Sequence, residues 1–325
     1  MVKIGNITFR NYPLLLAPME DITDQAFRLI CKEFGADLMF TEFVSSEALV
    51  RDVDKSIKKM HIDGRERPLG IQIFGHDKRS MIEATKYAER FEPDLIDLNF
   101  GCPVKKVVKK GGGAAVLKNP DEMIEMTRAI VKATNIPVSL KTRLGWDENH
   151  KIIDQIAEPL QDTGICALTI HGRTRNQFYK GIADWSLIRK IKDNPNIEIP
   201  IIGNGDIDGA ERAHQYIQKY QTDALMIGRA TIGQPWLFNE IHAYLEKREK
   251  PATPDLNERI EIFKKHLHYA IELKGEEKAV KEIRKFYSGY FKGVPNFKPF
   301  KVRLMTANTR DEIFEILQAF SKVDL

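Results

Sequence analysis

Eight short apolar runs, each followed by a segment with helical periodicity, constrain the fold of this chain more than any other feature of its sequence. The runs cover residues 14–17, 38–43, 69–74, 95–100, 137–144, 167–173, 199–206 and 224–230. Between them apolar residues recur at three- and four-residue spacing, as in the helix expected after Asn119 and Pro120. Because near-continuous apolar strands that alternate with helices indicate a parallel sheet, the pattern predicts an α/β fold with a closed (β/α)₈ TIM barrel, typically of about 250 residues.

A doubly wound open sheet is the alternative arrangement of the same elements. It is disfavoured because no G-x-G-x-x-G motif follows the first strand. The chain has 325 residues, of which 42% are hydrophobic, so it is long enough for one large α/β domain or for two domains.

The alternation of strands and helices ends near residue 250. Residues 251–258, PATPDLNE, contain two prolines and resemble a linker, and no strand is expected beyond them. Apolar residues on one helical face predict a helix over 256–274 that stops at Gly275, and TRDE at 309–312 has the form of a capping box. We therefore expect a barrel domain, residues 1–245, followed by a small all-helical domain, residues 246–325.

The charge of the chain is concentrated in the helical part. Residues 278–310 contain nine lysines and arginines and one acid, Glu282, a net charge of +8 in a chain that carries only +4 in total. The rest of the chain is therefore slightly acidic. A single-sign segment of this kind suggests an anionic macromolecular partner, although a solvated helical face would have the same composition.

The remaining composition indicates a cytoplasmic protein. No apolar stretch approaches membrane-spanning length, and no cleavage site follows the N-terminal apolar run. Three cysteines, Cys31, Cys102 and Cys166, cannot all pair and lack metal-ligand spacing, so we expect neither disulfides nor a metal.

The ends of the predicted strands give an inventory of candidate site residues, since chemistry in such barrels collects where the strands end. These positions are Pro18, Met19, Glu20, Gln72, Asn99, Gly101, Cys102, Lys141, Arg143, His171, Arg173, Asn204, Gly205, Asp206, Gly228 and Arg229. The loops after the seventh and eighth strands are where barrels commonly bind a phosphate through backbone N–H groups and a basic side chain. Each glycine alone would fit a tight turn, but two such loops together predict a phosphorylated ligand.

Lys141 lies in an apolar strand, where an ammonium group is costly to bury without a negative partner. A reduced flavin would supply that partner at its N1/O2 edge, and Gln72 could bind the polar rim of the ring. A Schiff-base lysine of an aldolase-type barrel and a structural ion pair are the alternatives.

Six ordered motifs carry a family resemblance. LAPMEDITDQAFR, DLNFGCPVKKV, SLKTRLGW, TIHGRTRNQFY, IGNGDI and MIGRATIGQPW together resemble the tRNA-dihydrouridine synthases, most closely their bacterial B branch. The resemblance implies an FMN-dependent enzyme that uses NADPH or NADH to reduce D-loop uridines of tRNA. It assigns the binding of FMN to Pro18, Met19, Glu20, Gln72, Lys141, Asn204, Gly205, Asp206, Gly228 and Arg229, with His171 beside the isoalloxazine.

The resemblance also assigns the proton donor and the RNA contacts. Reduction of the uracil C5–C6 bond needs a hydride, which flavin N5 supplies, and a proton, which Cys102 is expected to supply because a thiol is largely protonated at neutral pH. The helical domain corresponds to the tRNA-binding element, although Phe286 stands where related sequences often have His. The expected substrate-binding residues are Asn99, Arg173, Lys105, Lys106, Lys281, Arg284 and Lys285.

Two other functions stay open at the level of the sequence. One is a flavin barrel that acts on a free pyrimidine, as dihydroorotate dehydrogenases do, which would leave the basic helical segment without a role. The other is a non-catalytic RNA-binding relative, against which Cys102 and Lys141 argue. The sequence favours a monomer without fixing the oligomeric state, and it does not specify the uridine position, the preferred nicotinamide donor or a second RNA substrate.

Overall fold

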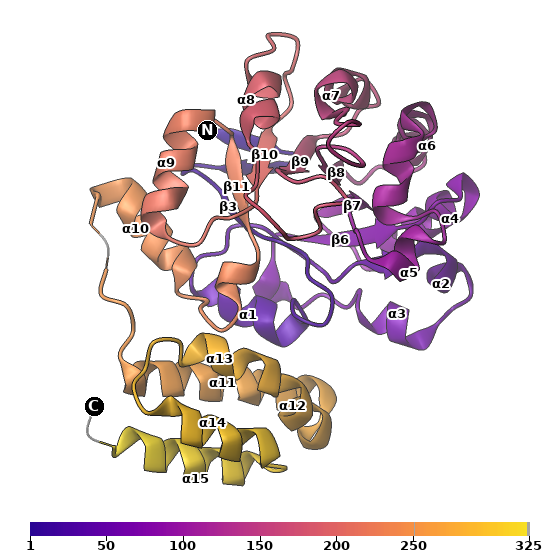
Figure 1. The fold of residues 1–325 in the computed structure, drawn as a ribbon. Helices are drawn as coiled ribbons and strands as arrows, with labels where there is room; N and C mark the ends of the chain where they lie inside the picture. Colours follow the sequence, from indigo (N-terminus) through magenta and orange to yellow (C-terminus); the bar gives the residue numbers. More distant parts are fainter. Residues whose placement is uncertain (250, 324–325) are drawn as a thin grey trace.

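The computed structural model describes residues 1–249 and 251–323, and a parallel barrel forms its centre (Figure 1). The barrel strands are β3 (Leu14–Leu16), β4 (Met39–Phe40), β6 (Leu69–Phe74), β7 (Leu95–Phe100), β8 (Val138–Arg143), β9 (Ala167–His171), β10 (Ile201–Asn204) and β11 (Ala224–Ile227). They pair in the order β3-β11-β10-β9-β8-β7-β6-β4. A parallel bridge between Leu15 and Leu38 closes the ring. The predicted barrel and its eight strands are confirmed.

Helices follow the strands and cover the outside of the barrel. They are α1 (Gln25–Glu33), α4 (Lys78–Glu89), α6 (Pro120–Lys132), α7 (Ile153–Gln161), α8 (Ser186–Lys192), α9 (Ala210–Tyr220) and α10 (Leu237–Lys247). As predicted, α6 begins after Asn119, whose side chain accepts from a backbone N–H of the first turn, with Pro120 at the first helical position. Short elements β5 (Val44–Ser45), α2 (Ser46–Val50) and α3 (Asp54–Lys58) lie between β4 and β6, and α5 (Lys105–Val108) follows β7.

An N-terminal hairpin, which the sequence analysis did not predict, closes the amino-terminal end of the barrel. Its strands β1 (Val2–Ile4) and β2 (Ile7–Phe9) are antiparallel. Ile4 and Phe9 are buried in the same apolar cluster as Leu15 and Met226, which belong to barrel strands. One end of the barrel is thus filled, and the open end is the one where the strands terminate.

The helical domain consists of α11 (Leu256–Lys274), α12 (Glu276–Ile283), α13 (Tyr287–Tyr290), α14 (Phe297–Thr306) and α15 (Arg310–Ser321). Residues 251–323 contain no strand, as predicted. Helix α11 has the expected extent, with a capping box of Asp255 and Glu258 at its start and Gly275 after its end. Phe286, Tyr287, Tyr290 and Phe291 are buried in the core.

The helical domain packs firmly against the barrel beside α1 (Figure 1). The rings of Phe27 and Phe286 lie with centroids 5.0 Å apart, and Lys274 forms a 2.5 Å ion pair with Asp24 at the start of α1. Both domains therefore share one apolar cluster. The division at residue 245 stays a prediction, and α10 runs through it to Lys247. Among the described helices, none is long and apolar enough to cross a membrane.

Candidate active site

A cavity of about 740 Å³ opens where the barrel strands end. This volume lies within the range of small-molecule and cofactor sites. The predicted site residues that line it are Pro18, Met19, Asn99, Gly101, Lys141, Arg143, His171, Arg173, Asn204, Gly205, Asp206, Gly228, Arg229 and Lys285. The parallel strands bring these positions, spread over most of the chain, to one rim.

Lys141, on strand β8, is a partly buried cation of the cavity. Its Nζ donates to Asn204 Oδ1 at 3.1 Å, its single hydrogen-bond acceptor within the described residues. Burial, together with the nearby Arg143 guanidinium, lowers the pKa of Lys141 to about 8, although the Asp97 carboxylate opposes this change. The ammonium therefore predominates at neutral pH and keeps donors available for a ligand.

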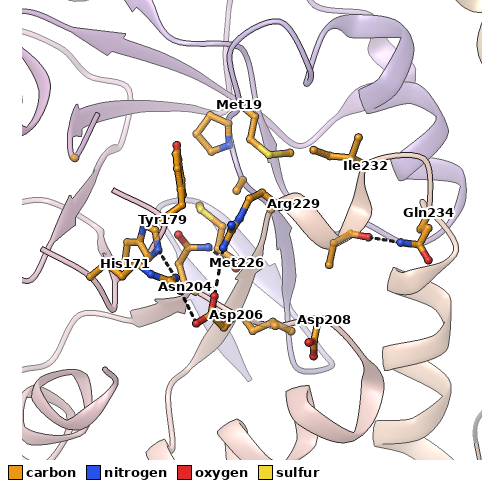
Figure 2. Close-up of a pocket in the computed structure, with 18 of the residues that line it drawn as sticks. Met19, His171, Tyr179, Asn204, Asp206, Asp208, Met226, Arg229, Ile232 and Gln234 are labelled. Atoms are coloured by element: carbon orange, nitrogen blue, oxygen red, sulfur yellow. Dashed lines mark hydrogen bonds and ion pairs between the residues drawn. The ribbon is translucent and has the colours of Figure 1, made fainter. Parts of the chain in front are cut away.

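Further cations surround Lys141 and keep His171 neutral. Burial, and then the charges of Arg143 and Lys141, hold the pKa of His171 well below its ordinary value. At neutral pH the imidazole is therefore an uncharged donor and acceptor. Arg173 and Arg229 bind the Asp206 carboxylate, with N–O distances of 2.7 and 3.3 Å (Figure 2).

The loop after β10 requires a glycine at position 205. Gly205 has a φ of +125°, and a Cβ there would lie 2.8 Å from Ala183 Cβ, so a side chain would be strained and crowded. The amide of Asn204 joins the two loops, because its Nδ2 donates to the Met226 carbonyl while its Oδ1 accepts from Lys141. Arg229 is half-exposed at the rim.

The backbone around Cys102 is fixed by the side chain of Asn99. Asn99 Oδ1 accepts from the backbone N–H groups of Gly101 at 3.0 Å and Cys102 at 2.9 Å. Cys102 follows the lining residue Gly101 directly but is not itself among the residues that line the cavity, and it is buried, with 6% of its surface exposed. Burial raises the pKa of its thiol, so the proton stays on sulfur at neutral pH.

A chain of buried hydrogen bonds supports Asn99 from inside the barrel. Asn99 Nδ2 donates to Gln72 Oε1 at 2.8 Å, and Gln72 Nε2 donates to an Asp97 carboxylate oxygen at 2.6 Å. Ser139 donates to the other carboxylate oxygen at 2.6 Å. Gln72 thus lies behind Asn99, fully buried, and is not among the residues that line the cavity. Its predicted contact with FMN stays a prediction.

The other predicted residues lie outside this cavity. Glu20 forms a 2.5 Å ion pair with Lys59 at the edge of a second cavity. Lys105 and Lys106 are exposed on α5, and Lys106 also lines that second cavity.

The predicted basic residues of the helical domain do not form one surface. Lys281 is exposed and pairs with Glu277 at 2.6 Å. Arg284 turns inward and donates to the Ala307 carbonyl at 2.9 Å. Lys285 instead lines the main cavity and donates to the Asp21 carbonyl. These three basic side chains of the helical domain therefore point in different directions.

Sequence reasoning missed several lining residues. Tyr179, from the loop after β9, lies beside His171, and the Arg143 and Arg229 guanidiniums lie 5.6 and 5.1 Å from its ring centroid (Figure 2). It is 51% exposed, which is unusual for a large aromatic side chain. The TRNQFY stretch after His171 contains this aromatic residue, but the position of a side chain in a loop of this length cannot be predicted from the sequence. Ser288 and Lys292 also reach the cavity from the helical domain. Lys292 was counted only as one of the nine cations of residues 278–310, and Ser288 carries no sequence signal of its own.

Comparison with known proteins places this geometry in a family. Residues 15–323 match the family described as "Dihydrouridine synthase (Dus)". The chain belongs to the dihydrouridine synthase family. The sequence is 38% identical to tRNA-dihydrouridine synthase B of Shewanella oneidensis over 319 residues, 98% of each chain. It is 39% identical to tRNA-dihydrouridine synthase B of Vibrio vulnificus over 291 residues, 90% of this chain and 89% of the relative.

Family membership confirms the resemblance predicted from the six motifs and the enzyme class, an oxidoreductase. It does not support the aldolase-type alternative for Lys141.

Solved structures agree on the fold. Histamine dehydrogenase from Rhizobium sp. 4-9 matches with a TM-score of 0.57 at 12% identity over 82% of this chain and 50% of its own. A mutant of morphinone reductase, in complex with tetrahydroNAD, matches with a TM-score of 0.54 at 12% identity over 74% of this chain and 89% of its own.

Proposed function

We propose that this chain is an FMN-dependent tRNA-dihydrouridine synthase that uses NADPH or NADH to convert D-loop uridines of tRNA to 5,6-dihydrouridine. The observation that carries the proposal is a family match over almost the whole chain, 15–323, in which Lys141 on β8 and Cys102, just after the neighbouring strand β7, lie at the same end of the barrel. The relatives named tRNA-dihydrouridine synthase B support tRNA as the substrate.

The residues of the main cavity fit a phosphorylated flavin. Lys141 is a partly buried ammonium with one acceptor within the described part of the chain, so it can donate to an anionic ring edge. The loops at Gly205 and Gly228 expose backbone at the cavity, and Arg229 adds a cation at its rim, which is the donor set that a phosphate needs. Lys141, Asn204, Gly205, Gly228 and Arg229 would hold the cofactor.

The neighbours of Lys141 adjust its charge for this role. A bound flavin supplies the hydride and accepts electrons from the nicotinamide donor. With a pKa of about 8, Lys141 is cationic at neutral pH and stabilises negative charge at a ring edge, whereas neutral His171 adds no further repulsion to the cations around it. Asp97, behind Lys141, offsets part of the cost of burying the ammonium.

Cys102 is proposed to deliver the proton. Its raised pKa keeps the thiol protonated, and the two backbone N–H bonds to Asn99 fix the position of its main chain. A positioned acid of this kind typically contributes about 10²- to 10⁴-fold to a rate. In this arrangement Asn99 and Arg173 border the space for the pyrimidine.

The partner and setting are part of the same proposal. Exposed Lys105, Lys106 and Lys281 are available for RNA phosphates, and Lys285 sits where RNA would enter the cavity. Arg284 is better explained by its bond to the Ala307 carbonyl than by RNA contact. We infer that the protein acts in the cytoplasm as a monomer.

Replacement of Cys102 with Ala tests the proposal. Formation of dihydrouridine, measured by mass spectrometry of digested tRNA, should fall about 10²- to 10⁴-fold. The variant should stay yellow and should still oxidise NADPH with a slow acceptor, since the thiol is not a cofactor ligand. Cys166→Ala is the control, because Cys166 lies at the amino-terminal end of β9. A colourless wild-type protein, or a Cys102→Ala variant with wild-type turnover on tRNA, would contradict the proposal.

A further inference from the structure

A second cavity of about 430 Å³ is lined in part by residues of the segment 104–112, which follows Cys102. Phe43 from the β4–β5 connection, Ser56 on α3 and Phe74 at the end of β6 form part of its wall. Val104 and Gly112, which flank α5, form the wall that faces the thiol loop. We propose that this cavity binds an unpaired RNA nucleotide next to the target uridine. The inference rests on the proposed function and specifies how its substrate is held.

The segment 102–113 follows Gly101, which lines the main cavity, and it contributes Val104, Lys106, Val107, Lys110 and Gly112 to the second cavity. Its first residue, Cys102, has its carbonyl bound by the Ala114 N–H at 3.0 Å, so the segment is folded back on itself behind α5. Val104, Lys106, Val107 and Lys110 present one side of this loop to the second cavity. In this proposal the RNA strand that presents the target base at Cys102 runs along α5, and the nucleotide beside the target occupies the second cavity.

The walls of the second cavity suit a nucleobase. The rings of Phe43 and Phe74 meet edge to face with centroids 5.4 Å apart. Val104, which also lines the cavity, is 47% exposed. Stacking on aromatic and apolar surface is how proteins bind single-stranded bases without requiring one sequence. An uncovered apolar surface of this kind otherwise calls for a partner.

Polar groups complete the requirements of a nucleotide. Ser45, Glu47 and His76 line the cavity and can bind the edge of a base, with His76 Nδ1 and Glu47 Oε1 3.0 Å apart. Lys55 and Lys110 are exposed at its margin and make no ion pair with any described residue, whereas Lys59 is taken by carboxylates. Free cations at the margin of an aromatic pocket are the combination that binds a phosphate beside a stacked base.

The adenylate part of a nicotinamide donor has the same chemistry, a base with phosphates. We assign the cavity to RNA because the donor must reach the main cavity, while the lysines of the second cavity continue along α5 as exposed Lys105 and Lys109. A basic row that extends past a pocket follows a polyanion rather than a single small molecule.

Filling the cavity provides the first experiment. Ser56→Trp places an indole in the cavity from a half-buried position without removing core packing. Lys58→Trp, on the same helix at a side chain 72% exposed and outside the cavity, is the matched control. With an unmodified tRNA transcript, Ser56→Trp should raise KM about tenfold, the size of one lost stacking contact. The KM for NADPH, measured with oxygen as acceptor, should not change in either variant.

A second experiment pairs protein and RNA changes. Abasic residues are placed in turn on each side of the target uridine, and kcat/KM is measured with wild-type protein and Phe43→Ala. At one of the two positions the abasic residue should lower kcat/KM about tenfold with wild-type protein. At that position it should not lower kcat/KM any further with Phe43→Ala. The inference would be overturned if the losses in kcat/KM from the abasic residue and from Phe43→Ala multiplied at both positions. An unchanged KM for tRNA in Ser56→Trp, or a raised KM for NADPH, would also overturn it. Absence of dihydrouridine with wild-type protein would instead contradict the proposed function.

Discussion

Asp97→Asn should make the protein more stable at neutral pH, with a gain that grows as the pH rises from 3.8 to about 6 and is small below pH 3.8. Asp97 is fully buried, and burial is the main cause that raises the pKa of its carboxyl from 3.8 to about 6, against the hydrogen bonds from Gln72 and Ser139 and the charge of Lys141. Asparagine keeps the shape and can still accept from Gln72, while Ser139 can rotate to accept from the new amide. The substitution therefore removes a charge with little loss of hydrogen bonding.

The size of the effect follows from proton linkage. Between pH 3.8 and about 6 the folded protein binds more protons at Asp97 than the unfolded chain does, so stability falls as the pH rises through this window. The displacement of the pKa from 3.8 to about 6 corresponds to about 3 kcal/mol of unfolding free energy at neutral pH. About 1 kcal/mol of it should be lost between about pH 5 and pH 7.

Urea unfolding followed by tryptophan fluorescence measures this difference. The free energy of unfolding of Asp97→Asn minus that of the wild type should increase by about 1 kcal/mol from about pH 5 to pH 7. Asp162→Asn, at an exposed position, is the control and should give no such trend. Parallel curves for the wild type and Asp97→Asn would refute the assignment of a raised pKa to Asp97.

The same variant should affect Lys141. Asp97 raises the pKa of Lys141, so its removal should lower that pKa further below about 8. The rate of flavin reduction should then decline at a lower pH than in the wild type, because the ammonium loses its proton earlier. If the alkaline limb of the pH profile does not move, Asp97 does not influence the chemistry of the site through Lys141.

Three further substitutions test other contacts. Lys141→Met should weaken flavin retention and slow flavin reduction because the ring edge loses its cation; dialysis followed by absorbance measures the first, and an unchanged flavin content would contradict the assignment. Gly289→Ala should destabilise the protein and loosen the helical domain, since a Cβ there would lie 1.9 Å from the Ile232 carbonyl oxygen; limited proteolysis near residue 250 measures this, and wild-type resistance would count against it. Arg28→Met should cost about 3–5 kcal/mol of stability because it leaves Glu66, 2.5 Å away and fully buried, without its partner; thermal melting gives the value, and a melting temperature within a degree of wild type would be inconsistent with a buried, uncompensated Glu66.

The barrel could be predicted because each of its strands is buried on both faces. Such strands are continuous apolar runs, and their carboxyl ends must meet at one rim. The sequence therefore predicted that Asn99, Lys141, His171 and Asn204 lie close together. The N-terminal hairpin was missed although Gly5 and Asn6 form a two-residue turn between its short strands.

The rest of the site depends on contacts that local sequence does not encode. Arg284 was counted as an RNA-binding cation, but charge alone does not tell which side of a helix faces the core, and the structure turns it toward Ala307. Ser288 and Lys292 reach the main cavity only because the helical domain docks on the barrel. That docking rests on pairs such as Phe27 and Phe286, far apart in the chain.

The packing of α1 against α11 sets an order on biosynthesis. Phe27 leaves the ribosome early, but its partners on α11 and beyond are made more than two hundred residues later, which takes on the order of ten to fifty seconds at bacterial or eukaryotic rates. The first barrel strand, β3, lacks its partner β11 for almost as long, since Leu14 pairs with Leu225. During this interval the nascent chain displays apolar surface that nothing yet covers. We expect it to need chaperone protection, and chains cut short before α11 to be degraded rather than to accumulate as free barrels.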